Sequence, residues 1–204
     1  MDLRDALTQI AEIRQQVART ETFRGYRALP VALSGALAWV AAGLQVVLIV
    51  DPARQIDSYL TLWLGAALAS LMVTGAVMLW HARHAASPLA RSMTLLAVGQ
   101  FLPAMVAGGL VTLVLSRYAE ESLWMLPGLW SILFSLGVFA SHRLLPPAIF
   151  WIGTWYLAAG LVSLVWAQGE YALSPWAMAI PFGVGQLLAA AILYWHLERN
   201  YDEG

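Results

Sequence analysis

Six stretches of this 204-residue chain contain no charged side chain and are long enough to cross a membrane as helices. A transmembrane helix needs about 20 predominantly apolar residues. Strand alternation is absent, and in lipid each backbone N–H and C=O must be paired within the protein, which favours helices over strands. The pattern therefore predicts an all-α integral membrane protein with six transmembrane helices. The stretches cover residues 28–50, 58–80, 92–116, 122–141, 144–168 and 171–195.

The arginines predict how the chain is oriented. Loops on the cytoplasmic side of a membrane carry an excess of basic residues. The N-terminal segment, the second and fourth loops and the C-terminus contain Arg4, Arg14, Arg19, Arg24, Arg27, Arg83, Arg91, Arg143 and Arg199, whereas the other loops contain Arg54 and Arg117. Both termini are therefore expected in the cytoplasm. We divide the chain into a cytoplasmic N-terminal helix (1–24), a six-helix transmembrane domain (25–199) and a short cytoplasmic tail (200–204).

Composition excludes several classes of function. The chain has no cysteine and no lysine, so disulfides, thiolate metal sites and lysine Schiff bases are ruled out. Its net charge of -1 gives no basic excess for binding nucleic acid. The apolar stretches contain no Asp, Glu, Lys or Arg, the residues that mark proton relays and catalytic centres in membranes. The sequence thus favours a non-enzymatic protein. Its composition resembles that of small bacterial inner-membrane proteins, so we expect it in the cell (inner) membrane.

A histidine stands at the end of the second, fourth and sixth apolar stretches. A reference residue stands fifteen positions before each of His81, His142 and His196: Ala66, Pro127 and Pro181, in that order. Small residues stand four and eight positions after each reference residue. Small residues four apart let membrane helices approach closely. We therefore predict three repeated helical hairpins, at about 28–84, 88–143 and 146–199. The reference and small residues are Ala66, Ser70 and Thr74, then Pro127, Ser131 and Ser135, then Pro181, Gly185 and Ala189.

Two interpretations of these histidines stay open. If the three helices surround a pseudo-threefold axis, His81, His142 and His196 would converge and could bind Zn²⁺ or ligate haem. Alternatively, each imidazole caps the last carbonyls of its helix and extends toward the headgroups. No sequence-local metal motif such as H-E-x-x-H is present. We therefore expect no cofactor and keep zinc or haem as the alternative.

Three glutamines are candidates for a polar lining inside the spans: Gln45, Gln100 and Gln186. They would line the path of a small solute in a channel or transporter. The alternative is hydrogen bonding between helices, which contributes about 0.6–2 kcal/mol per bond in membranes. Pro127 and Pro181 are expected in the first turns of their spans, where proline is tolerated.

The N-terminal segment provides the remaining candidate site. Its apolar residues recur in alternating steps of three and four, which predicts a helix with a narrow apolar seam. Self-association, a partner protein or the bundle's own cytoplasmic face would cover that seam. We therefore expect a regulatory, scaffolding or interaction module that works through residues 1–23. The seam residues are Leu3, Ala6, Ile10, Ile13 and Val17.

Overall fold

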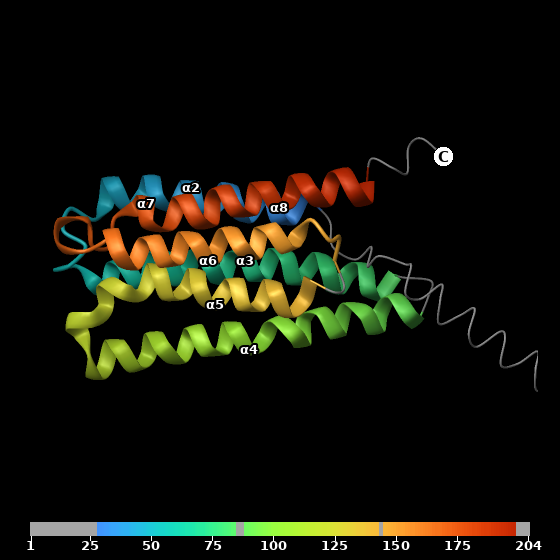
Figure 1. Cartoon of the computed structure of the whole chain (residues 1–204), viewed down its shortest axis with the longest axis horizontal. Coiled ribbons are helices and arrows are strands. Elements are labelled where there is room, and N and C mark those ends of the chain that lie inside the picture. Colours follow the sequence, from blue (N-terminus) through green and yellow to red (C-terminus); the bar gives the residue numbers. More distant parts are fainter. Residues whose placement is uncertain (1–27, 85–87, 143–144, 199–204) are drawn as a thin grey trace, which may run out of the picture.

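The structure is a computed structural model that describes residues 28–84, 88–142 and 145–198. These residues form helices joined by short turns (Figure 1). The long helices are α2 (Ala28–Leu48), α3 (Ile56–His84), α4 (Pro88–Tyr118), α5 (Leu126–Ser141) and α6 (Ile149–Trp166). The last span is composite: α7 (Pro175–Met178), η4 (Ala179–Val184), α8 (Gly185–Leu193) and η5 (Tyr194–Glu198) follow one another without a break, and η1 (Glu120–Met125) precedes α5 in the same way.

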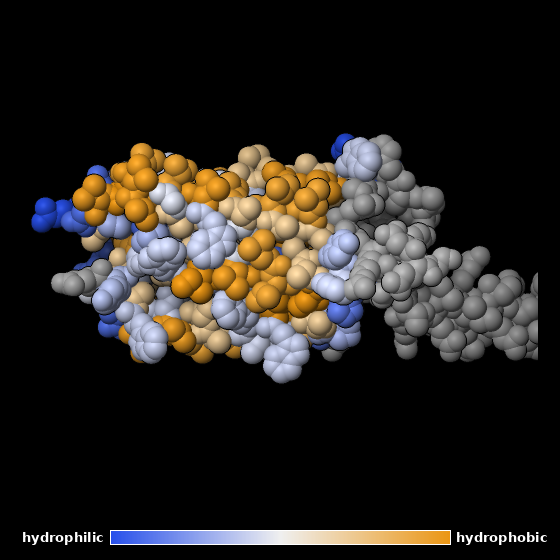
Figure 2. Space-filling view, turned by 90° about the horizontal axis from the view of Figure 1, so that it is seen from above, coloured by the Kyte–Doolittle hydropathy of each residue, from blue (hydrophilic) through white to orange (hydrophobic). Residues whose placement is uncertain are grey.

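Six helical segments in the described part of the chain are long and apolar enough to span a membrane. This confirms the predicted all-helical membrane fold. Figure 2 shows hydrophobic residues covering the middle of one face, with strongly hydrophilic residues at its left end. The spans are Ala28–Leu48, Ile56–Trp80, Val98–Tyr118, Glu120–Ser141, Ile149–Trp166 and Pro175–His196.

The spans run up and down, so that α2 begins and η5 ends at the same end of the bundle, which we call the terminal end (Figure 1). The closest packing joins α5 to α6, and α5 also packs on α4. On the other side, α2 packs against α3, α8 and η4. The tight α5–α6 pair crosses the boundary between the second and third predicted hairpins.

Four aromatic rings join α4, α5, α6 and the last span. Phe134 of α5 lies 4.9 Å from Phe101 of α4, 4.6 Å from Tyr156 of α6 and 5.5 Å from Phe182 of η4, measured between ring centroids. Tyr156 and Phe182 are also in contact, at 5.4 Å. These separations lie in the favourable range for aromatic pairs, about 4.5–7 Å. We call these four residues the aromatic plug, because they join four spans through one cluster.

The two prolines expected in first turns behave differently. Pro127 lies in the first turn of α5, as predicted. The prediction for Pro181 was wrong, because the last span begins at Pro175 and Pro181 lies inside the π-helical segment η4. A proline has no N–H to donate and its ring clashes with the preceding turn. A wider π turn accommodates both effects without ending the helix.

Candidate functional site: an apolar groove between α6 and α8

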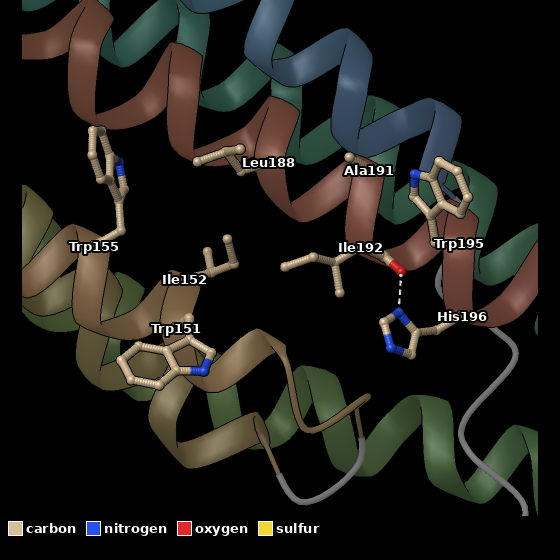
Figure 3. A pocket seen from close by; sticks show the side chains of 8 residues that line it. All are labelled: Trp151, Ile152, Trp155, Leu188, Ala191, Ile192, Trp195 and His196. Atoms are coloured by element: carbon tan, nitrogen blue, oxygen red, sulfur yellow. Dashed lines mark hydrogen bonds between the residues drawn. The ribbon is translucent and has the colours of Figure 1, made fainter.

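An apolar groove lies between the first turns of α6 and the last turns of α8 and η5, toward the terminal end of the bundle (Figure 3). Its volume is about 390 Å³, within the range of about 300–1,000 Å³ typical of ligand pockets. Ile152 and Ile192 point toward each other across it (Figure 3). The groove is lined by Trp151, Ile152, Trp155, Leu188, Ala191, Ile192, Trp195 and His196.

Helical spacing brings these side chains to facing sides of the two helices. Residues three or four apart lie on one helix face, as do Trp151 and Trp155 on α6, and Leu188, Ala191 and Trp195 on the last span. The Trp151 side chain is 69% exposed and that of Trp195 is 54% exposed. The groove therefore opens on the outer surface of the bundle, which faces lipid in a membrane.

Two π-helical segments border the groove. η4 is held from the α6 side, where the indole N–H of Trp155 donates to the carbonyl oxygen of Pro181 at 3.2 Å. η5 contributes Trp195 and His196 to the lining itself. Single π turns inside α-helices are rare and occur frequently at functional sites. Because η5 contributes to the lining and η4 bonds to the lining residue Trp155, this region is our candidate site.

Glycines allow η4 and α8 to approach their neighbours closely. A Cβ atom on Gly183 would lie 2.5 Å from the indole nitrogen of Trp39, and one on Gly185 would lie 2.7 Å from Cζ of Tyr156. Neither position therefore accepts a larger residue without a shift of the facing ring. The buried Tyr156 hydroxyl lies near the side chain of Gln186, although no contact there meets hydrogen-bond geometry. These contacts hold η4 close to α2 and the start of α8 close to α6.

The two described histidines bond to their own helices. Nδ1 of His142 lies 2.8 Å from the carbonyl oxygen of Phe139, and Nδ1 of His196 lies 2.9 Å from that of Ile192. This is the geometry of the helix-capping interpretation. The side chain of His81 lies outside the described residues. Within the described part, no group of three His, Cys, Asp or Glu side chains is close enough to hold a metal ion.

The three candidate glutamines occupy different environments. Gln45 is buried, donates to the carbonyl oxygen of Leu173 at 2.7 Å and accepts from the indole N–H of Trp63 at 2.7 Å. Both ends of its amide thus hold the Leu173 turn and α3 against α2. Leu173 itself has a positive φ of 58°, and the Gln45 bond stabilises that uncommon backbone conformation. Gln100 has a buried amide oxygen without a hydrogen-bond partner among the described residues, and Gln186 lies half-buried beside Tyr156.

The glutamines do not share a described cavity. A second hollow of about 380 Å³, at the end opposite the terminal end, is lined by Gln45 together with residues of the 171–175 turn. Neither this hollow nor the groove is lined by Gln100 or Gln186. The predicted seam residues Leu3, Ile10, Ile13 and Val17 lie outside the described part of the chain.

Sequence reasoning missed most of the groove. Trp195 was interpretable as part of an aromatic belt at the headgroups, and His196 as a ligand or cap. Trp151 and Trp155 carry a sequence signal, because two tryptophans four residues apart mark one helix face. That signal does not reveal which other helix faces them.

Comparison with known proteins identifies no relative. No protein-family model matches the chain, and no curated protein or solved structure is significantly similar to it.

Proposed function

We propose that this chain is a small multi-pass membrane protein that acts as a non-enzymatic regulatory, scaffolding or interaction module. The aromatic plug carries this proposal, because its ring contacts hold four spans together. The engaged amide of Gln45 supports it further, since that amide is used in holding helices together. Such a bundle is suited to presenting surfaces rather than to conducting solutes.

Residues 1–23 are the proposed contact with a protein partner or with a second copy of the chain. Their apolar seam needs a cover, and Leu3, Ile10, Ile13 and Val17 would provide the contact. The arginine distribution supports a cytoplasmic position for this segment and for the C-terminus, in the inner membrane of a cell. The lipid bilayer is then the partner of the six spans.

The three-hairpin repeat remains part of the proposal as an account of how such a bundle arose. Its support is the burial of small residues at the repeated positions. Ser131, Ser135 and Gly185 are buried, whereas Ser70 and Thr74 are half-buried. Close approach of helices at such positions is how membrane bundles gain packing contacts.

The test uses photo-crosslinking amino acids in the predicted N-terminal seam. Incorporated in cells at Ile10 or Ile13, the crosslinker should yield one discrete adduct, either a homodimer or a complex with a second protein. Gln15 is the matched control, because it falls on the opposite face of the same predicted helix. Deleting residues 1–23 should abolish the interaction while the spans stay folded. Equal adducts from all three positions would contradict the proposal.

Cysteine labelling separates this function from transport. The chain contains no cysteine, so Gln100→Cys and Gln186→Cys each introduce a single thiol. We expect no reaction with a water-soluble thiol reagent in intact membranes, because neither position lines one of the two described hollows. Labelling of both positions, together with solute flux in proteoliposomes, would favour a channel or transporter instead.

A further inference from the structure

We propose that the groove between α6 and α8 binds one hydrocarbon chain of a membrane phospholipid, with the phosphate of that lipid beside His196. This site goes beyond the proposed function, since it involves neither residues 1–23 nor a protein partner. The proposal rests on two features of the groove: its lining and the direction of its polar atoms.

The lining suits a hydrocarbon chain. Its members are aliphatic or aromatic except for His196, which stands at the end of the lining nearest the end of the span. The indole N–H of Trp155, which would otherwise offer a donor to a polar ligand, is directed to the carbonyl oxygen of Pro181. The wall that Trp155 presents to the groove is therefore its apolar ring, and dispersion contacts favour an extended apolar occupant.

The rim suits a phosphate group. Nδ1–H of His196 donates to the carbonyl oxygen of Ile192. A phosphate oxygen, which only accepts, would therefore contact the ring through the Nε2–H that the imidazolium form carries. The position lies near the end of a span, at the depth where lipid headgroups begin. We therefore assign the contact to the phosphate that phospholipids share.

A soluble ligand or a segment of this chain fits less well. The groove opens on the lipid-facing side of the bundle, where water-soluble molecules are scarce. The N-terminal seam is narrow and is flanked by Asp5, Glu12 and Arg14, whose charges would be costly to place in hydrocarbon. A lipid chain enters sideways from the bilayer and brings its own polar group to the correct depth.

The test measures retention of lipid by the purified full-length chain. Detergent-stripped protein is titrated with dioleoylphosphatidylcholine or with dioleoylglycerol, which has the same chains and no phosphate, and bound lipids are counted by native mass spectrometry. We expect one phosphatidylcholine to bind about tenfold more tightly than dioleoylglycerol, the effect of one hydrogen bond to a charged group. Equal binding of the two lipids would overturn the phosphate contact.

Two pairs of variants locate the site. Ala191→Trp should fill the groove and weaken phosphatidylcholine binding by at least about tenfold, whereas Ala76→Trp, at an exposed alanine of α3, should leave it unchanged. His196→Ala should remove the preference for phosphatidylcholine, while His142→Ala, which loses a similar helix cap, should retain it. If Ala191→Trp fails to fold, Trp151→Ala replaces it, because it removes one exposed wall and should also weaken binding. Equal retention by groove and control variants would overturn the site.

Discussion

Glycine has opposite roles in two regions of this bundle. Between α5 and α6, a Cβ atom on Gly128 would lie 2.9 Å from the carbonyl oxygen of Gly160, and one on Gly160 would lie 2.8 Å from that of Gly128. On α3 and α4, a Cβ on Gly65, Gly75 or Gly109 would meet nothing within 4 Å. The same residue therefore brings two backbones together in one region and leaves an open surface in the other.

The difference extends to whole spans. In the span that contains α5, 44% of the most apolar 18-residue stretch is buried inside the bundle. The corresponding stretches in the spans of α3 and α4 are each 11% buried. Close helix packing in membranes depends on small residues at the contact. A small residue thus contributes to stability where a second helix lies against it, and its presence in a sequence does not show where that is. The following variants test this comparison, from the largest expected effect to the smallest.

Gly160→Val should destabilise the bundle by about 3 kcal/mol, the upper range for overpacking. Its added methyl groups would press on the backbone of α5, which cannot move aside as a side chain can. Thermal unfolding of the detergent-solubilised protein measures the effect. Gly109→Val is the matched control and should change stability by less than about 0.5 kcal/mol. Similar losses in the two variants would refute the distinction between the regions.

Gln45→Leu should lower the free energy of unfolding by about 1–2 kcal/mol, because it leaves the Trp63 indole N–H and the Leu173 carbonyl oxygen without their partner. The same measurement applies. Gln168→Leu is the control, since Gln168 is exposed, follows α6 and donates to the carbonyl oxygen of Leu164 in the last turn of that helix. An unchanged stability for Gln45→Leu would show that the amide does not hold α2, α3 and the Leu173 turn together.

His142→Ala should cost about 0.5–1.5 kcal/mol, the usual contribution of one hydrogen bond. His196→Ala should cost less, because His196 is exposed.

Metal analysis and a visible absorption spectrum extend the test to the variant with His81, His142 and His196 all changed to Ala. We expect equal metal and haem content in this variant and the native chain. A near-integral cofactor that disappears in the variant would favour the metal or haem hypothesis instead.

Gly75→Ala should raise stability by up to about 0.5–1 kcal/mol, because alanine loses less conformational entropy than glycine in a helix. Gly153→Ala is the contrasting variant. A Cβ at Gly153 would lie 2.5 Å from Cε1 of Phe139, so this change should lower stability by displacing the Phe139 ring. A loss of stability in Gly75→Ala would indicate that a second molecule packs on α3.

Part of the candidate site was predictable from single residues. The sequence predicted that His196 stands at the end of its span, and it offered the role of helix cap as one of two alternatives. The groove was not predictable, because it requires particular faces of α6 and α8 to lie opposite each other. The predicted hairpin at 146–199 does not specify which helix faces meet. Pro181 illustrates the same limit, since its π turn depends on where the helix begins and on the Trp155 indole that bonds to its carbonyl oxygen.

The sequence by itself determined that this chain is an all-helical protein with six apolar spans. The physical reason is that lipid offers no hydrogen bonds, so that length and apolarity alone select helices of membrane-spanning size. Tertiary structure decided which helices touch: α5 against α6, four spans through the aromatic plug, and α6 beside α8 at the groove. Those outcomes depend on dispersion and shape matching between residues distant in the sequence, which apolar composition does not distinguish.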